Sequence, residues 1–342
     1  MTNNACFAPQ RVLFEERALD YPLGRSLWER FRKEDKEVRV IGSHNRVTGL
    51  PGKDPAEKFK EAKRTLVVGV KKEGEFAKCR PSADFQLVLS TSCPGMCEYC
   101  YLHTTLGRQP VVRLYVNVEE ILERAEKVIK DRAPEETVFE GAATSDPLPL
   151  EPYSGALAQA ITFFAKQEHA RFRFVTKFTC VDSLLNLKHQ GRTEFRFSVN
   201  TPEIINRFEH GTPRLTARLQ AAAKVFQAGY KLGFLVAPIF LYDGWKKSYE
   251  ELLLEMKDTL PAKAAPSFEL ITHRFTARGK QNIAAIFPSS ELPLSEEERR
   301  FKYGQFGYGK YVYTKEQYQE AERYLSEKIN VYFPSAEILY FV

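Results

Sequence analysis

Residues 86–101 read QLVLSTSCPGMCEYCY, a β-rich run that leads directly into three cysteines. Cys93, Cys97 and Cys100 follow the spacing C-x3-C-x2-C, with proline and glycine in the loop between the first two. Three thiolates on so short a loop can converge on one face of an iron–sulfur cube. A [4Fe–4S] cluster usually takes about four cysteines, so three leave one iron open to bind a substrate.

A structural zinc site is the main alternative for this motif. His103 is a candidate fourth ligand for zinc, but the paired spacing of zinc ribbons and fingers is absent. A second alternative is that the cysteines are simply buried near each other. The position of the motif directly after a strand favours the iron–sulfur interpretation over both.

Further β-rich runs follow the motif and alternate with amphipathic stretches. The β-rich runs lie at 137–142, 171–178, 194–200, 231–239 and 267–275, and amphipathic stretches lie at 118–132, 155–167 and 215–229. Together with the run at 86–92 they predict parallel strands joined by right-handed crossovers. The count is too small for a closed barrel, so we expect an α/β fold with a partial (β/α)6 TIM-like barrel. Functional groups should gather at the C-terminal ends of its strands.

The regions outside the barrel have a different composition. Residues 1–84 are charged and irregular, and we expect an N-terminal region packed on the barrel of residues 85–275. Residues 276–342 begin with a basic stretch rich in glycine and aromatic residues. They predict a C-terminal β-hairpin and a closing helix at 314–329.

Composition sets limits on the class of protein. The chain has 342 residues, of which 43% are hydrophobic and 13% aromatic, so a substantial core is expected and global disorder is excluded. Neither a secretory signal nor an apolar window of about 20 residues is visible. We therefore expect a cytoplasmic protein that does not contact a membrane and acts as a monomer. The net charge of +6 is on its own a weak indication of nucleic-acid binding.

The cysteine spacing and the partial barrel together resemble the radical S-adenosylmethionine superfamily. Three longer strings are similar to the spore photoproduct lyase family: SCPGMCEYCYLHTTLG (92–107), EGAATSDPLPLEP (140–152) and RFSVNTPEIINRFEHGTPR (196–214). Enzymes of this family repair DNA by reversing the thymine dimer 5-thyminyl-5,6-dihydrothymine. The likeness covers essentially the whole chain. It implies a DNA substrate that contains this lesion and an electron donor that remains unidentified.

The resemblance also implies the cofactors. The open iron is expected to chelate S-adenosylmethionine, and an electron from the reduced cluster then gives a 5′-deoxyadenosyl radical. Residues at strand ends match the family's cofactor positions, and they are Ser145, Lys177, Ser198, Asn200 and the backbone of Ala237. Hydroxyl and amide groups can bond a ribose or a carboxylate. For Ser198 and Asn200 the alternative is a capping role, because Thr201-Pro202 begins a predicted helix.

Two tyrosines flank the last cysteine of the motif. The resemblance implies that Tyr99 and Tyr101 relay a hydrogen atom that regenerates S-adenosylmethionine. The alternative is that the rings only pack beside the cluster and bond through their hydroxyls. Tyr99 is close enough in sequence to line the cofactor pocket as well.

Ala143 is the one departure from the family pattern that bears on mechanism. In the family a cysteine just past the second strand gives a hydrogen atom to the thymine radical left by the repair reaction. Here that position is Ala143, and alanine has no S–H. Either the chain is a natural variant with another donor, or the cysteine was replaced deliberately. The intact surrounding string favours replacement. We expect a chain that cleaves the lesion but returns few correct thymines.

The stretch RRFKYGQFGYGKYVYTK (299–315) interleaves cations with aromatic rings. Cations contact phosphates, and rings can replace bases removed from the stack. Its glycines permit a hairpin. Because a lesion of two adjacent bases must be flipped out, Tyr308 and Lys310 are candidates to fill the gap. The other predicted DNA contacts are His273, Arg274, Arg299, Lys302 and Tyr311. An ordinary hairpin with one solvated face is the alternative.

Two further hypotheses use the same motifs. One keeps the radical chemistry but changes the substrate to RNA or a small molecule. The other is a non-catalytic nucleic-acid-binding protein stabilised by a metal.

Overall fold

The computed structural model describes residues 7–34, 36–303 and 309–342, without the side chains of 103 and 104. The chain divides into two compact units, one formed by residues up to 95 with 108–194, the other by 96–107 with 195–342. Each unit is described below by itself.

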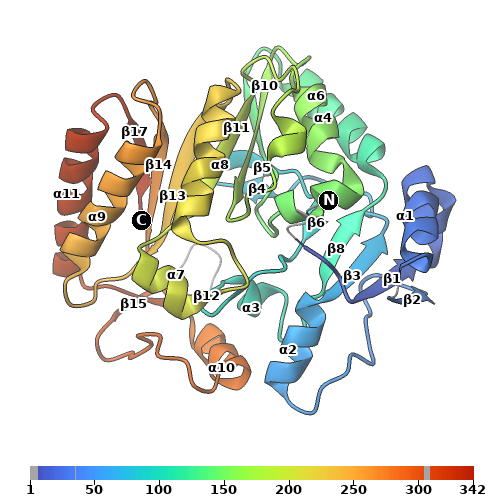
Figure 1. Ribbon diagram of the computed structural model, residues 1–342, viewed down its shortest axis with the longest axis horizontal. Helices are drawn as coiled ribbons and strands as arrows, with labels where there is room; N and C mark the ends of the chain where they lie inside the picture. Colours follow the sequence, from blue (N-terminus) through green and yellow to red (C-terminus); the bar gives the residue numbers. More distant parts are fainter. Residues whose placement is uncertain (1–6, 35, 304–308) are drawn as a thin grey trace. The chain divides into compact units, whose positions relative to one another are not determined.

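The first unit contains a mainly parallel sheet that lies largely in the N-terminal region (Figure 1). Its strands, in spatial order, are β2 (Glu37–Ile41), β1 (Arg11–Glu15), β3 (Thr65–Gly69), β8 (Val112–Tyr115) and β6 (Ser90–Thr91). Its connections include η1 (Glu16–Asp20), α1 (Pro22–Arg32), α2 (Pro55–Lys63) and α4 (Val118–Arg132). Residues 1–84, whose sequence is charged and irregular, contribute strands β1, β2 and β3 to this sheet. The run TLVVG of β3 is buried at every position, which is typical of a strand in a parallel sheet.

The first unit also carries the beginning of the predicted barrel. Neighbouring strands run in the order β4 (Lys78–Cys79), β5 (Ala83–Gln86), β9 (Thr137–Glu140) and β10 (Ala170–Thr176). The connections after β9 and β10 include η2 (Leu148–Leu150), α5 (Glu151–Ser154), α6 (Ala156–Phe164) and η3 (Asp182–Leu184). β5 pairs with β9, and β9 with β10, in parallel. The predicted first strand at 86–92 was misplaced. β5 ends at Gln86, and Ser90–Thr91 pairs antiparallel with β8 in the other sheet.

Helix α4 shows why the helical predictions succeeded. Val118, Ile121, Leu122, Ala125 and Ile129 are buried, which places them on one stripe with a helical period. Acidic residues occupy its first turn and basic residues its last, in the orientation that the helix dipole favours. The helix covers the predicted residues 118–132.

The second unit carries the later barrel strands. Their order is β11 (Thr193–Val199), β13 (Lys231–Ile239), β14 (Ser267–Thr272) and β17 (Glu337–Phe341), where β11 begins at the last two residues of the first unit. The helices of this unit are α3 (Leu102–Thr105), α7 (Pro202–Phe208), α8 (Leu215–Gln227), α9 (Trp245–Thr259), α10 (Ala277–Ile286) and α11 (Lys315–Tyr332). The C-terminal strand β17 and helix α9 were not predicted. Helices α9 and α11 contact each other beside β14 (Figure 1).

Two short antiparallel strand pairs complete the second unit. β7 (Met96–Cys97) pairs with β12 (Glu209–His210), and β15 (Arg300–Tyr303) pairs antiparallel with β16 (Gly309–Val312). The second pair confirms the predicted arms of the C-terminal hairpin. Among the described residues, no helix combines the length and apolar character that crossing a membrane requires.

Candidate functional site

The three motif cysteines lie on one loop that joins the two units. The boundary falls after Gly95, so Cys93 belongs to the first unit and Cys97 and Cys100 to the second. None of the three forms a disulfide. Cys97 is buried, while Cys93 and Cys100 are partly exposed. The Gly95 N–H donates a hydrogen bond to Cys93 Sγ at 3.3 Å, a contact that stabilises negative charge on sulfur.

The first half of the loop is held by groups outside the motif. Ser92 has a positive φ of 66°, which a serine adopts only when its surroundings enforce it. Its N–H donates to Thr144 O at 2.9 Å and its hydroxyl to Pro110 O at 2.7 Å. The buried Lys63 ammonium, at the end of α2, donates to Cys93 O at 2.8 Å. Sequence reasoning missed Lys63, although it follows the buried Phe59 at helical spacing.

The second half of the loop is held by the segment after α7. The Glu98 N–H donates to Phe208 O at 2.9 Å, and the two-residue strands β7 and β12 pair beside it. The Glu98 carboxylate also lies 2.6 Å from Nε2 of His210. Residues of the string FEHGTPR therefore hold the backbone segment that carries Cys97 and Cys100.

The donor set of this loop fits an iron–sulfur cluster by its chemistry. Clusters bind cysteine thiolates, and the loop offers three that are free of disulfides. Across the described ranges, no three His, Cys, Asp or Glu side chains already surround one point as metal ligands. The side chain of His103, the fourth ligand of the zinc alternative, lies outside the described side chains.

Ser145 carries a buried hydroxyl at the end of the second barrel strand. Its Oγ has no hydrogen-bond partner in the part of the chain that the structure describes. Its backbone bridges to Ser92, next to the first cysteine. A buried hydroxyl without a partner is costly, and a bound ligand that bonds it would remove this cost.

Asp146 organises the end of the third barrel strand. Its carboxylate accepts hydrogen bonds from the Thr176 hydroxyl at 2.8 Å and from the Lys177 N–H at 2.9 Å. Burial raises the pKa of Asp146 to about 6. The backbone of Lys177 is therefore fixed by its neighbour, and the side chain is partly exposed. Sequence reasoning did not single out Asp146.

The strand ends of the second unit are tied together by Asn200. Its amide donates to Pro238 O at 2.7 Å, and its Oδ1 accepts from the Tyr249 hydroxyl and the Thr201 N–H, each at 3.0 Å. Thr201, and neither Ser198 nor Asn200, caps helix α7. Ala237 precedes Pro238 at an irregularity in β13. The cofactor roles of Ser198, Asn200 and Ala237 stay predictions.

Ala143 lies in a turn whose neighbours are fixed. The Gly141 N–H donates to Arg173 O at 2.8 Å, and a side chain at Gly141 would collide with the ring of Phe172. The Ala142 N–H donates to the Glu140 carboxylate at 3.0 Å. Ala143 itself is partly exposed, so a larger side chain there has access to space outside the core.

The two tyrosines of the motif lie in different environments. The Tyr99 hydroxyl donates a short hydrogen bond to the buried carboxylate of Glu209. Burial and this carboxylate raise the pKa of the Tyr99 phenol well above its usual range. Tyr101 is 59% exposed. For Tyr99 the geometry shows the packing and bonding role, and the relay role of both tyrosines stays a prediction.

The C-terminal hairpin gathers cations and exposed rings. Lys302 of β15 is the register partner of Lys310 of β16, and Phe301 and Tyr303 are exposed. Burial, Arg274 and Lys302 together lower the pKa of Lys310. Like charges opposite each other cost about 0.2–1 kcal/mol, a cost that a bound anion would offset. The predicted contact Tyr308 lies outside the described residues.

The root of the hairpin is a packed cluster. Tyr311 stacks on Phe275 with ring centroids 5.3 Å apart, and their backbones exchange hydrogen bonds. The Arg299 guanidinium lies 3.6 Å from the centre of the Tyr313 ring and donates to His273 O at 3.0 Å. Because His273 is buried, its placement favours support of Arg299 over a direct phosphate contact. Burial and Arg299 lower the pKa of His273 to about 3.

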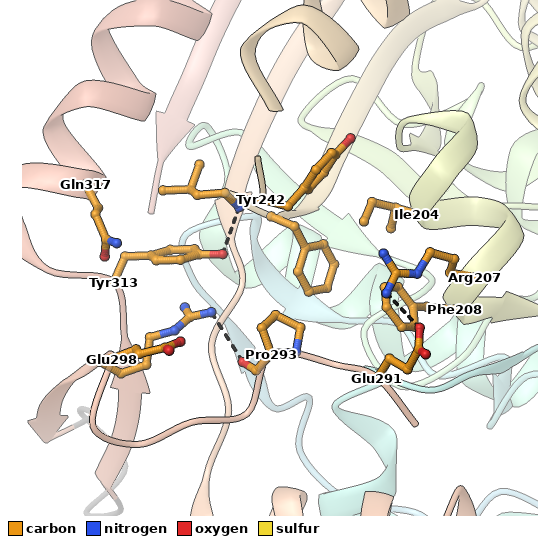
Figure 2. Close-up of a pocket in the computed structure, with 12 residues that line it drawn as sticks. Ile204, Arg207, Phe208, Tyr242, Glu291, Pro293, Glu298, Tyr313 and Gln317 are labelled. Carbon is orange, nitrogen blue, oxygen red and sulfur yellow. Dashed lines mark hydrogen bonds and ion pairs between the residues drawn. The ribbon is translucent and has the colours of Figure 1, made fainter. Parts of the chain in front are cut away.

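A cavity of about 200 Å³ opens beside this cluster (Figure 2). The two arginines that line it have partners: Arg207 pairs with Glu291 at 2.9 Å, and Arg299 donates to Pro293 O at 3.4 Å. The Leu241 N–H donates to the Tyr313 hydroxyl at 2.9 Å. Of the predicted site residues only Arg299 lines it, so the cavity is a feature of the hairpin root.

A sequence model of the family described as spore photoproduct lyase matches residues 7–342. The chain belongs to the spore photoproduct lyase family. The resemblance noted from the cysteine loop and its flanking strings is thereby confirmed. Because the match covers nearly the whole chain, it includes the N-terminal sheet, the barrel strands and the hairpin.

Relatives with the same family name support this membership. Spore photoproduct lyase of Clostridium acetobutylicum is 49% identical over 333 residues, which cover 97% of this chain and 98% of that protein. The enzyme of Bacillus subtilis is 45% identical over 337 residues, with 98% of each chain covered.

Solved structures of the family match at the level of the fold. Spore photoproduct lyase complexed with dinucleoside spore photoproduct has a TM-score of 0.95 and 45% identity, over 98% of this chain and 99% of that chain. The same values hold for a variant, with a cysteine changed to alanine and a serine to cysteine, that has bound AdoMet and the dinucleoside. These matches confirm the predicted α/β partial barrel.

Proposed function

We propose that this chain is a radical S-adenosylmethionine lyase that reverts the spore photoproduct in DNA to two thymines. The observation that carries the proposal is membership of the family over the whole chain, with three disulfide-free cysteines on one loop. Its relatives bear the name of this activity at 45–49% identity. We further propose that it acts as a monomer and takes its electron from a separate donor.

We propose that Cys93, Cys97 and Cys100 hold a [4Fe–4S] cluster. When bound, the cluster supplies the electron that splits S-adenosylmethionine into methionine and a 5′-deoxyadenosyl radical. The chain's own groups position that cofactor: the Ser145 hydroxyl, which has no partner among the described residues, Lys177 and the strand ends at Ser198, Asn200 and Ala237. A related variant in which one cysteine is replaced by alanine and one serine by cysteine has bound AdoMet and dinucleoside spore photoproduct, and the variant with the alanine replacement alone has dinucleoside spore photoproduct. Replacement of a cysteine by alanine is therefore compatible with binding of the dinucleoside in a protein of this family.

Replacing Ser145 by alanine should weaken cofactor binding selectively. The variant removes a buried hydroxyl that has no partner in the described structure, so the fold should not lose a hydrogen bond. If this hydroxyl bonds S-adenosylmethionine, the KM for the cofactor should rise about tenfold, as expected for one neutral hydrogen bond. Thermal unfolding should change little. An unchanged KM would remove Ser145 from the cofactor site.

We propose that the hairpin binds the phosphates around the lesion. Three cations lie near one another here, because Lys302 faces Lys310 in register and, besides burial, the charges of Arg274 and Lys302 both lower the pKa of Lys310. The exposed rings of Phe301 and Tyr303 lie on the same strand as Lys302. A phosphate backbone would neutralise the cations, and the rings can stack on bases displaced from the duplex.

Replacing Lys302 by alanine should weaken binding of DNA without changing the rate of lesion reversal. We expect weaker binding of a lesion-containing duplex, with the salt slope of the affinity reduced by about 1, since one phosphate contact is lost. Turnover of the dinucleoside lesion should stay unchanged, because a dinucleoside offers no flanking phosphates for Lys302 to bind. Lys257→Ala, at the end of α9, is a control of equal charge change. Equal losses in both variants would argue against a role of the hairpin.

Consumption of the dinucleoside lesion tests the proposed function. Protein reconstituted with iron and reduced in the presence of S-adenosylmethionine should consume spore photoproduct. A radical enzyme for RNA or a small molecule would form 5′-deoxyadenosine but leave the lesion intact. A zinc-stabilised binding protein would produce neither result.

A further inference from the structure

Arg218 and Glu209 form a fully buried ion pair beside the cysteine loop. Arg218 lies on α8 and Glu209 on β12, and both side chains are 0% exposed. Burying two charges is costly unless every polar atom is well bonded. Arg218 occupies the apolar stripe of its helix, between Leu215 and Ala222, where a charged residue is rare without a specific partner.

The bonds of Arg218 reach several separate backbone segments. Its Nη2 donates to Glu209 Oε2 at 2.5 Å and to the Thr212 hydroxyl at 2.9 Å. Its Nε donates to Pro213 O at 2.9 Å, and its Nη1 donates to Ser198 O at 3.0 Å. One guanidinium therefore ties the turn after β12 to the end of β11, the strand that carries Ser198 and is followed directly by Asn200.

Glu209 carries this connection to the cysteine loop. Its other carboxylate oxygen accepts the hydroxyl of Tyr99, and its backbone is the register partner of Cys97 in the β7–β12 pair. The adjacent Glu98 N–H bonds Phe208 O, one residue before Glu209. The side chain and the backbone of Glu209 thus hold the same four-residue segment, Cys97 to Cys100, from two directions.

We propose that Arg218 and Glu209 are positioning residues that keep the segment from Cys97 to Cys100 in register with the end of β11. The inference rests on the proposed function, since it assigns the segment to the cluster and β11 to the cofactor. Arg218 bonds one carboxylate oxygen of Glu209, and the other oxygen accepts the Tyr99 hydroxyl, so both links run through one side chain. The pair therefore fixes the segment that carries two proposed cluster ligands relative to the strand end that carries Ser198.

Hydrogen exchange in the full chain tests the pair without relying on activity. Glu209→Gln keeps an acceptor and the shape of the side chain but removes its charge, and Arg218→Lys keeps the charge but removes the planar fork. We expect the amides of Glu98 and Cys100 to exchange at least about tenfold faster in either variant, before and after iron reconstitution. The amides of α4 should keep their rates.

Glu269→Gln is the matched control. It breaks the Arg196–Glu269 ion pair of the same unit. In that pair Arg196 Nη1 also lies 2.5 Å from a carboxylate oxygen, and the two side chains are 3% and 1% exposed. It should lower thermal stability as much as Glu209→Gln but leave exchange at Glu98 and Cys100 unchanged. Equal acceleration in the control, or none in the two test variants, would overturn the proposal. If Arg218→Lys does not fold, Glu209→Gln and Tyr99→Phe test the proposal in its place. Tyr99→Phe removes the hydrogen bond to Glu209 but keeps the Arg218–Glu209 ion pair.

A second measurement separates this inference from the proposed function. In reconstituted protein, the variants should form more 5′-deoxyadenosine per lesion consumed than the parent, by about threefold or more, because a misplaced cluster segment uncouples cofactor cleavage from repair. A ratio equal to that of the parent and of Glu269→Gln would contradict positioning. If the parent consumes no lesion, the proposed function fails, while the exchange result still reports on the pair.

Discussion

Replacing Cys97 by alanine is expected to abolish cofactor cleavage and lesion consumption together. Cys97 is the buried member of the three, and its backbone is paired with β12. Loss of an outer-shell partner of a metal site costs about 10–100-fold, so loss of a ligand should exceed this and reduce activity to the background of the assay. Iron content after anaerobic reconstitution and the amount of 5′-deoxyadenosine are the two readouts.

Cys79→Ala is the matched control for this prediction. Cys79 lies on the short strand β4 and is partly exposed, outside the loop of the three motif cysteines. Its replacement should leave iron content and cofactor cleavage unchanged. If Cys97→Ala binds as much iron as the parent and still cleaves the cofactor, the assignment of the loop to the cluster is wrong.

Replacing Ala143 by cysteine is expected to raise the yield of intact thymine sharply. The resemblance implies that a cysteine at this position gives a hydrogen atom to the thymine radical, and alanine has no S–H to give. The parent chain should therefore consume lesion but form mainly products quenched by outside reagents. Ala143 is partly exposed, whereas a side chain at Gly141 would collide with the ring of Phe172.

Ala143→Ser separates the effect of the thiol from that of size. Serine adds one heavy atom, as cysteine does, but its O–H bond is far stronger than S–H and should not yield a hydrogen atom to an allylic radical. We expect its product distribution to resemble that of the parent. Chromatography with mass detection of thymine and its adducts decides the matter. A clean thymine product from the parent itself would show that this chain uses another donor.

The periodic parts of the fold could be predicted because each element has a buried face. The alternation in RFRFVT and EFRFSV, and the helical stripe at 118–132, place β10, β11 and α4 within one or two residues of their observed bounds. The first strand was misplaced because the apolar run QLVLSTS is divided between two sheets. A run of buried residues indicates burial but does not indicate which sheet receives it.

The site could be predicted only where the residue types themselves indicate its chemistry. Cysteine spacing and strand-end hydroxyls point to a cluster and a ligand. The supports could not be predicted in the same way, because Lys63, Glu209 and Arg218 act through contacts 30, 110 and 20 residues away, at Cys93, Tyr99 and Ser198. Two of the three left a signal in the sequence: Arg218 is a charge on the apolar stripe of α8, and Lys63 follows Phe59 at helical spacing. Because a buried charge is costly without its hydrogen-bond partners, it holds the groups that it bonds in fixed positions.

Formation of 5′-deoxyadenosine tests the central claim most directly. The chain is reconstituted with iron and sulfide under anaerobic conditions, reduced and mixed with S-adenosylmethionine, with Cys97→Ala treated in parallel. The proposed function predicts 5′-deoxyadenosine from the parent chain and none above background from the variant. A parent chain that binds zinc in place of iron, or that loads iron and leaves S-adenosylmethionine intact, would contradict it.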